Sequence, residues 1–139
     1  MSVDSAGMAA RLGIKPGMVV QELGWDEDAD EDLRDAIIEV SGGEMVDEDT
    51  DEVADVVLLW WREDDGDLVD ALVDAIASLA DEGVVWLLVP KSGRPGHVEP
   101  GDVTEAAPTA GLAQTSSISA AKDWSGIRLV TPKAARSRR

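Results

Sequence analysis

The apolar residues of the chain form short continuous runs and longer periodic stripes. The runs at 54–61 (ADVVLLWW) and 84–89 (VVWLLV) are apolar on both faces, which is typical of strands in the middle of a covered sheet. A run at 18–23 (MVVQEL) predicts a first strand. Residues 112–120 and 126–130 predict two closing strands joined around the sequence KDWSG.

Helical periodicity occupies the segments between the first three strands. From 29 to 40, apolar residues recur at helical spacing, and Asp28 followed by Glu31 predicts the N-cap. A second amphipathic helix is predicted over 67–81, with Gly83 as its terminator.

The order of these elements indicates the fold class. Strands that alternate with helices and end in a strand pair predict an α/β protein: a three-layer, Rossmann-like sandwich with a mostly parallel sheet and a C-terminal antiparallel strand pair. We expect one domain over 1–132, followed by a basic, disordered tail at 133–139. Three weaker elements are a helical lead-in at 8–12, a short strand within 44–53 and one helical turn at 102–107 before Pro108.

The composition of the chain excludes several types of catalytic and metal-binding site. The 139 residues include no cysteine, which excludes disulfides, thiolate metal sites and cysteine nucleophiles. The one histidine, His97, has no nucleophile near it in the sequence, and no Ser-His-Asp set or phosphate-binding loop stands out. We therefore assign no catalytic residue, no metal site and no cofactor. The apolar runs are too short to span a bilayer and no signal peptide precedes them, so we expect a cytoplasmic protein.

Charge is distributed unevenly along the chain. The formal net charge is −17, and residues 1–89 carry 25 of the 29 acidic side chains but only 4 of the 12 basic ones. Such an acidic body repels duplex DNA and anionic membranes. Only the tail KAARSRR at 133–139 could contact nucleic acid, and we expect a protein partner instead. The oligomeric state is left open.

The turn after the first strand is the candidate ligand site. In methyltransferases of the common Rossmann-like class, an acidic residue ends strand one and glycines follow at alternate positions, where the backbone approaches S-adenosylmethionine. The matching residues here are Glu22, Gly24, Asp26 and Asp28.

The two aspartates in this turn change what it can bind. Asp26 and Asp28 add bulk and negative charge where the cofactor would lie, so the sequence favours a degenerate, closed cofactor site. A working adenosylmethionine site with an atypical acidic loop is the alternative. The acidic spacing also suggests a calcium loop, but Glu31 stands where that loop needs glycine, and Ile37 where it needs the closing glutamate.

Several motifs together resemble a known family. The motifs are LGIKPG, QELGWDEDADEDLRD, DVVLLWWR, GVVWLLVPKSG and DWSGIRLV, over residues 11 to 133. They resemble the bacterial family of domain of unknown function 3052, in particular its actinobacterial branch. The resemblance implies a fold like that of class I methyltransferases with a degenerate glycine motif, and it implies no established reaction.

Residues from three predicted strand ends would meet at one edge of the sheet. As Trp and Arg are favoured anchors of interfaces, this candidate partner-binding rim consists of Trp25, Trp60, Trp61, Arg62, Lys91, Ser92 and Arg94. In the other interpretation, the tryptophans plug the empty cleft and the cations neutralise Asp26 and Asp28. Trp124 is expected to be the packing anchor of the terminal hairpin.

The sequence thus predicts a non-catalytic, cytoplasmic binding or regulatory protein on a degenerate methyltransferase-like fold. The alternative is an enzyme that uses S-adenosylmethionine or another adenosine ligand.

Overall fold

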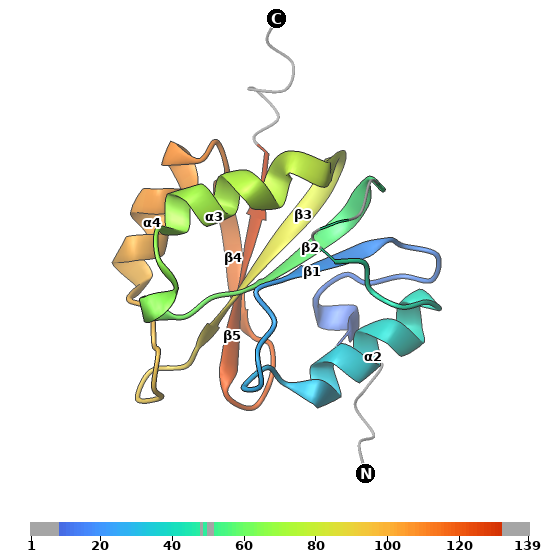
Figure 1. The fold of residues 1–139 in the computed structure, drawn as a ribbon, viewed down its shortest axis with the longest axis horizontal. Coiled ribbons are helices and arrows are strands. Elements are labelled where there is room, and N and C mark those ends of the chain that lie inside the picture. Colours follow the sequence, from blue (N-terminus) through green and yellow to red (C-terminus); the bar gives the residue numbers. More distant parts are fainter. Residues whose placement is uncertain (1–8, 48, 50–51, 132–139) are drawn as a thin grey trace, which may run out of the picture.

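The computed structural model describes residues 9–47, 49 and 52–131 (Figure 1). The tail predicted at 133–139 and Met8 of the predicted lead-in lie outside these residues. The strands within them are β1 (Val20–Leu23), β2 (Ala54–Trp60), β3 (Leu79–Pro90), β4 (Ala113–Ser119) and β5 (Trp124–Val130). The helices are α2 (Glu31–Ser41), α3 (Leu68–Ala75) and α4 (Pro100–Thr109), with 3-10 turns η1 (Glu63–Asp65) and η2 (Ile76–Ser78).

The strands form a single mixed sheet in the order β1-β2-β3-β5-β4. The first three strands are parallel, and β5 runs antiparallel to both β3 and β4. Helix α2 covers one face, while α3 and α4 cover the other (Figure 1). The predicted three-layer α/β sandwich, mostly parallel with an antiparallel C-terminal pair, is confirmed.

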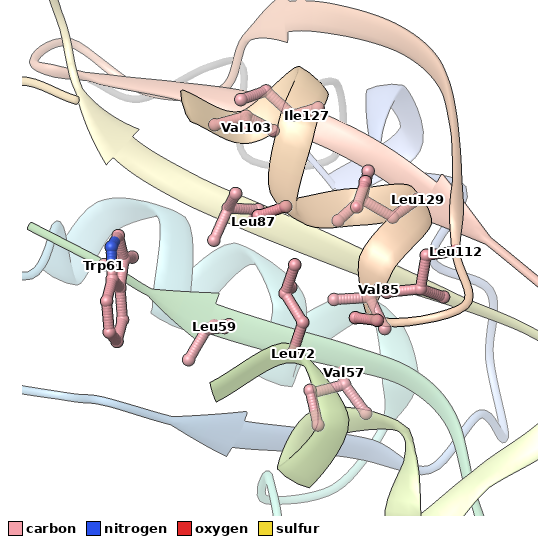
Figure 2. Close-up of a cluster of buried hydrophobic side chains, with 14 of the residues drawn as sticks. Val57, Leu59, Trp61, Leu72, Val85, Leu87, Val103, Leu112, Ile127 and Leu129 are labelled. Atoms are coloured by element: carbon pink, nitrogen blue, oxygen red, sulfur yellow. The ribbon is translucent and has the colours of Figure 1, made fainter. Parts of the chain in front are cut away.

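Two hydrophobic cores explain why the central strands are apolar on both faces. In β2, Val57 and Leu59 pack toward α3 and α4, in the core drawn in Figure 2. Leu58 and Trp60 alternate with them and pack toward α2. Because successive strand residues point to opposite faces, a strand between two helical layers has to be apolar at every position.

The weak strand predicted within 44–53 is reduced to one bridge. Val46 pairs in parallel with Gln21, on the side of β1 away from β2. The backbone N–H of Glu22 donates to the Val46 carbonyl at 2.8 Å, and the Val46 N–H donates to the Val20 carbonyl at 2.9 Å.

The predicted helix over 67–81 is wrong in its second half. Helix α3 ends at Ala75, and β3 begins at Leu79, which pairs with Ala54 of β2. Leu79 packs against the same core as α3, so its place in the periodic stripe could not distinguish helix from strand. Gly83 lies inside β3, where a Cβ atom would be 2.6 Å from the Leu79 side chain and 3.0 Å from the Asp55 carbonyl oxygen of β2, so a glycine allows this close packing.

Helix α4 is longer than the single turn predicted at 102–107. It begins with Pro100, whose fixed φ and missing N–H suit a first helical position, and it continues past Pro108 to Thr109. Pro108 lies in the last turn, where its missing N–H removes one hydrogen bond without ending the packing of Val103 and Ala107 on the sheet.

Helix α3 offers a test of this packing. Leu72 is fully buried and its neighbour Val73 is 48% exposed. We expect Leu72→Ala to lower the free energy of unfolding by about 2–5 kcal/mol, because it leaves a cavity in the core. Val73→Ala should cost less than about 1 kcal/mol. Urea unfolding of both variants measures the difference, and equal losses would contradict the assigned face of α3.

Candidate functional site

The carboxyl ends of β1 and β2 flank the point where the sheet order reverses. After β1 the chain passes through α2 to Val46, on one side of β1, and then crosses to β2 on the other side. Ligands of open α/β sheets bind at such switch points. The candidate turn that starts at Gly24 lies there.

Gly24 packs directly against the backbone of β2. Its φ is +75°, and a Cβ atom at this position would lie 2.3 Å from the carbonyl oxygen of Trp60. The glycine therefore has a structural use here, since any side chain would collide with β2.

The side chain of Arg62 occupies the gap beside Gly24. Its Nη1 donates to the Gly24 carbonyl at 2.7 Å and to the Trp60 carbonyl at 3.3 Å. Its Nε and Nη2 bind the two carboxylate oxygens of Asp28, at 3.1 and 2.5 Å. A further contact of 3.3 Å joins Nη1 to Asp65, and only 12% of the arginine side chain is exposed. One guanidinium thus joins the ends of both strands to the turn between β1 and α2.

The pairing changes the electrostatics of the turn. The hydrogen bond from Arg62 is the main cause that lowers the pKa of Asp28 below its ordinary value. Burial by itself would lower the pKa of Arg62, but the hydrogen bonds to Asp28 and Asp65 outweigh it and leave the pKa raised. The charge of Asp28 is therefore paired with Arg62 inside the protein.

Glu22, the acidic residue at the end of β1, is also engaged inside the protein. Its two carboxylate oxygens accept from Nε and Nη2 of Arg34 at 2.6 and 2.8 Å, and the indole N–H of Trp60 donates to it at 2.9 Å. The Glu22 side chain is 9% exposed. The hydrogen bond to Glu22 is the main cause that raises the pKa of Arg34 above its usual value.

Two further acids of the turn, Asp30 and Asp26, accept hydrogen bonds from backbone N–H groups. Asp30, and not Asp28, is the N-cap of α2, because its carboxylate accepts from the Leu33 N–H at 2.9 Å. The predicted N-cap at Asp28 is therefore wrong, and Asp28 is turned to Arg62 instead. The Asp26 carboxylate accepts from the Glu27 N–H at 2.7 Å, and the Asp26 carbonyl accepts from the Ala29 N–H.

The seven residues of the predicted rim do not form one surface. Trp60 and Trp61 are buried, on opposite faces of the sheet. Trp25 is 48% exposed, with its ring beside Arg34 and its indole N–H 3.4 Å from Glu31.

The rim residues after β3 lie on the adjoining loop. Lys91 donates to the Ser119 hydroxyl, Ser92 is exposed, and Arg94 pairs with Asp123 at 3.1 Å. Of the three candidate cations, Arg62 pairs with an aspartate of the turn, whereas Lys91 and Arg94 contact the β4–β5 hairpin.

Trp124 belongs to the site, although the sequence pointed only to packing. It is buried as expected, its ring is 4.8 Å from that of Trp60 in an edge-to-face arrangement, and its indole N–H donates to the Asp28 carbonyl at 3.2 Å. The guanidinium carbon of Arg62 lies 5.2 Å from the Trp124 ring centre. No local spacing could reveal this contact, because Trp124 enters from the C-terminal hairpin.

An open cavity of about 330 Å³ adjoins the filled gap. It lies between the turn, the loop after β3 and the hairpin, and is lined by Asp28, Pro90, Arg94, Pro95, Asp123 and Trp124. Among the described residues, no three His, Asp or Glu side chains come together as metal ligands. Within the same residues, no helix is long and apolar enough to cross a membrane.

Comparisons with known proteins show the family of the chain and the type of fold. The family described as "Protein of unknown function (DUF3052)" matches residues 9–133. "Uncharacterized protein Rv2239c" of Mycobacterium tuberculosis and "Uncharacterized protein Mb2263c" of Mycobacterium bovis are each 57% identical over 135 residues. Those residues are 97% of this chain and 85% of each relative.

Solved structures with a similar fold include a methyltransferase and a biosynthetic protein. A "SAM dependent methyltransferase from Aquifex aeolicus" has a TM-score of 0.63 at 13% identity, over 93% of this chain and 90% of that one. The "Pyocyanin Biosynthetic Protein PhzM" has a TM-score of 0.67 at 13% identity over 94% of this chain, which spans only 55% of PhzM. At these identities the likeness shows a methyltransferase-like fold and nothing further.

The close contact at Gly24 predicts a large loss of stability on substitution. Gly24→Ala places a Cβ atom against the Trp60 carbonyl and forces alanine to a positive φ, so we expect a loss of at least about 2 kcal/mol. Gly43→Ala is the matched control, because Gly43 is exposed and has no atom within 4 Å of the added Cβ. Urea unfolding followed by tryptophan fluorescence compares them, and equal stability would refute the contact.

The Asp28–Arg62 pair predicts a measurable, pH-dependent coupling. In a double-mutant cycle of Asp28→Asn and Arg62→Met, we expect about 1–2 kcal/mol at pH 7, a value reduced by the partial exposure of Asp28. Because the pKa of Asp28 is lowered on folding, the coupling is present above the unfolded value of about 3.9 and is lost as pH falls through the folded value.

The exposed pair Arg94–Asp123 is the control for this cycle. The same cycle with Arg94→Met and Asp123→Asn should give about 0.5 kcal/mol or less, because both side chains are open to solvent. A coupling for Asp28–Arg62 no larger than this would show that Arg62 does not hold the turn.

Proposed function

We propose, for a chain that belongs to the family described as "Protein of unknown function (DUF3052)", a non-catalytic role in binding another protein. The methyltransferase-like fold acts as a scaffold, and the cofactor cleft of that fold is closed by the chain's own side chains. The observation that carries this proposal is the position of Arg62 between Gly24, Trp60 and Asp28.

The energy needed to reopen the gap supports this role. A ligand at the switch point has to displace a guanidinium that holds two backbone carbonyls and the Asp28 carboxylate. Hydrogen bonds to charged groups contribute about 1.5–3 kcal/mol each, so displacement costs several kcal/mol. Micromolar affinity corresponds to about 8 kcal/mol in total, and the displacement removes a large part of it.

The surface around the filled gap offers contacts for a protein partner. Trp25 is half exposed beside the acidic turn, and the cavity bordered by Arg94 and Asp123 opens next to it at the same edge of the sheet. Exposed Trp and Arg are favoured interface anchors. The net charge of −17 favours a partner with a basic surface over duplex DNA.

A methyltransferase or another adenosine-ligand enzyme is the alternative. Two features favour it: the likeness to a methyltransferase over 93% of the chain, and the retention of an acidic residue and a glycine at Glu22 and Gly24. In this alternative, Arg62 swings out of the gap when the ligand enters.

Calorimetry with S-adenosylmethionine and S-adenosylhomocysteine separates the two functions. We expect no binding heat from the wild-type protein at ligand concentrations up to about 1 mM, because Arg62 fills the gap. Arg62→Ala is measured in parallel to show whether removing the side chain admits the ligand. Micromolar binding by the wild-type protein would overturn the proposal in favour of the enzyme.

Co-purification from the native host tests the partner. We expect a specific protein to be lost when Trp25→Ala is combined with Lys91→Glu and Arg94→Glu, with Arg62 left intact because it holds the acidic turn. Arg11→Glu combined with Lys15→Glu is the matched charge control, because it also reverses two exposed cations, which precede β1 at the opposite edge. A partner retained by the triple variant, or no partner at all, would count against this surface.

A further inference from the structure

A second cavity lies on the α4 face of the sheet and shares Pro90 with the cavity beside Arg62. Its volume is about 160 Å³, and it is bordered by β3, β4, β5, the start of α4 and the segment before α4, with the side of β4 open to solvent. Its apolar lining includes Val89, Val98, Val103 and Ile127, and Figure 2 shows Val103 and Ile127 close together at the end of the core. A cavity of about 150 Å³ with apolar walls is large enough for a benzene ring.

His97 lines this cavity and is hydrogen-bonded through one ring nitrogen. Its Nδ1 lies 2.9 Å from the Pro90 carbonyl oxygen, which can only accept, so Nδ1 carries the hydrogen. In the neutral imidazole the other nitrogen, Nε2, is then an acceptor. The described residues give Nε2 no partner, and the imidazole lines the cavity.

Two serine hydroxyls and the amide of Gln114 complete the polar part of the lining, and the Gln114 side-chain oxygen accepts from the Thr104 hydroxyl at 3.5 Å. Ser117 of β4 and Ser125 of β5 line the cavity, and within the described residues neither side chain has a hydrogen-bond partner. The cavity therefore combines an apolar floor with a few unpaired polar groups, the composition of small-molecule sites in general.

Charge limits what the cavity accepts. The net charge of −17 disfavours an anion, and an apolar lining without an acidic side chain disfavours a cation. A neutral molecule meets neither penalty.

We propose that this cavity binds a small, uncharged molecule about the size of phenol, which has an apolar ring and one hydroxyl or N–H group that donates to Nε2 of His97. The ring packs on the valines and Ile127, and the donor fixes its orientation. This site is independent of the function proposed for the Arg62 edge.

Phenol is the probe, and His97 is its own reporter. Because the chain has one histidine, the imidazole Cε1–H resonance in an NMR spectrum is identified without assignment. We expect phenol to shift it saturably with a Kd of about 1–10 mM, in the range for a ligand with few atoms. Anisole, which has the same ring but no donor, should bind about 2- to 10-fold more weakly.

Two neighbouring residues of β4 provide matched variants. Ser117→Phe places a ring at the cavity and should abolish the phenol shift. Ser116→Phe places the same ring on the opposite face of the same exposed strand and should leave the shift unchanged. Circular dichroism verifies that both variants fold.

Different results would contradict the site itself and the role of His97 within it. No saturable shift of the His97 resonance in the wild-type protein, or the same response in both phenylalanine variants, would overturn the site. Equal affinity for phenol and anisole would overturn the role of His97 as acceptor.

Discussion

The hydrogen bonds of the Arg62 guanidinium organise the carboxyl edge of the sheet. They join the end of β1 at Gly24, the end of β2 at Trp60 and the acidic turn at Asp28, so three segments distant in sequence are held by one side chain. The face of Trp124 lies against the same guanidinium. A mostly buried arginine is tolerated here because carboxylates and carbonyls surround it. The acidic turn also depends on it, since Asp28 has no other cation within hydrogen-bond reach among the described residues.

Each buried indole N–H on the α2 face of the sheet donates a hydrogen bond to an acceptor within the protein. Trp60 donates to Glu22, Trp86 to the Leu12 carbonyl and Trp124 to the Asp28 carbonyl. In a chain without Phe or Tyr, these three rings fill the core under α2, and each N–H anchors a different segment to it. Glu22 and Gly24, the two residues that match a cofactor loop, are thereby employed in packing and pairing.

The acidity of the chain has a local and a global consequence. Locally, Asp26, Asp28 and Asp30 each accept from a particular donor, so the turn is not an undifferentiated negative patch. Globally, the 25 acidic residues in 1–89 face only 4 basic ones, so this part of the chain carries a negative long-range field. The distinction explains why charge counting does not give the geometry of the turn.

The sequence by itself determined the α/β class, the doubly covered strands β2 and β3, and the presence of a turn at Gly24, because hydrophobic periodicity and glycine positions are local properties. It failed at Leu79, where helix and strand bury the same side chain, and at Asp28, where a distant arginine outcompetes the N-cap role. Only the tertiary structure decided that Arg62 fills the gap, that Trp60 and Trp61 face opposite cores, and that Trp124 and His97 each line a cavity. Those outcomes depend on which strand ends become neighbours in the sheet, and strand order is set by packing between segments far apart in the chain.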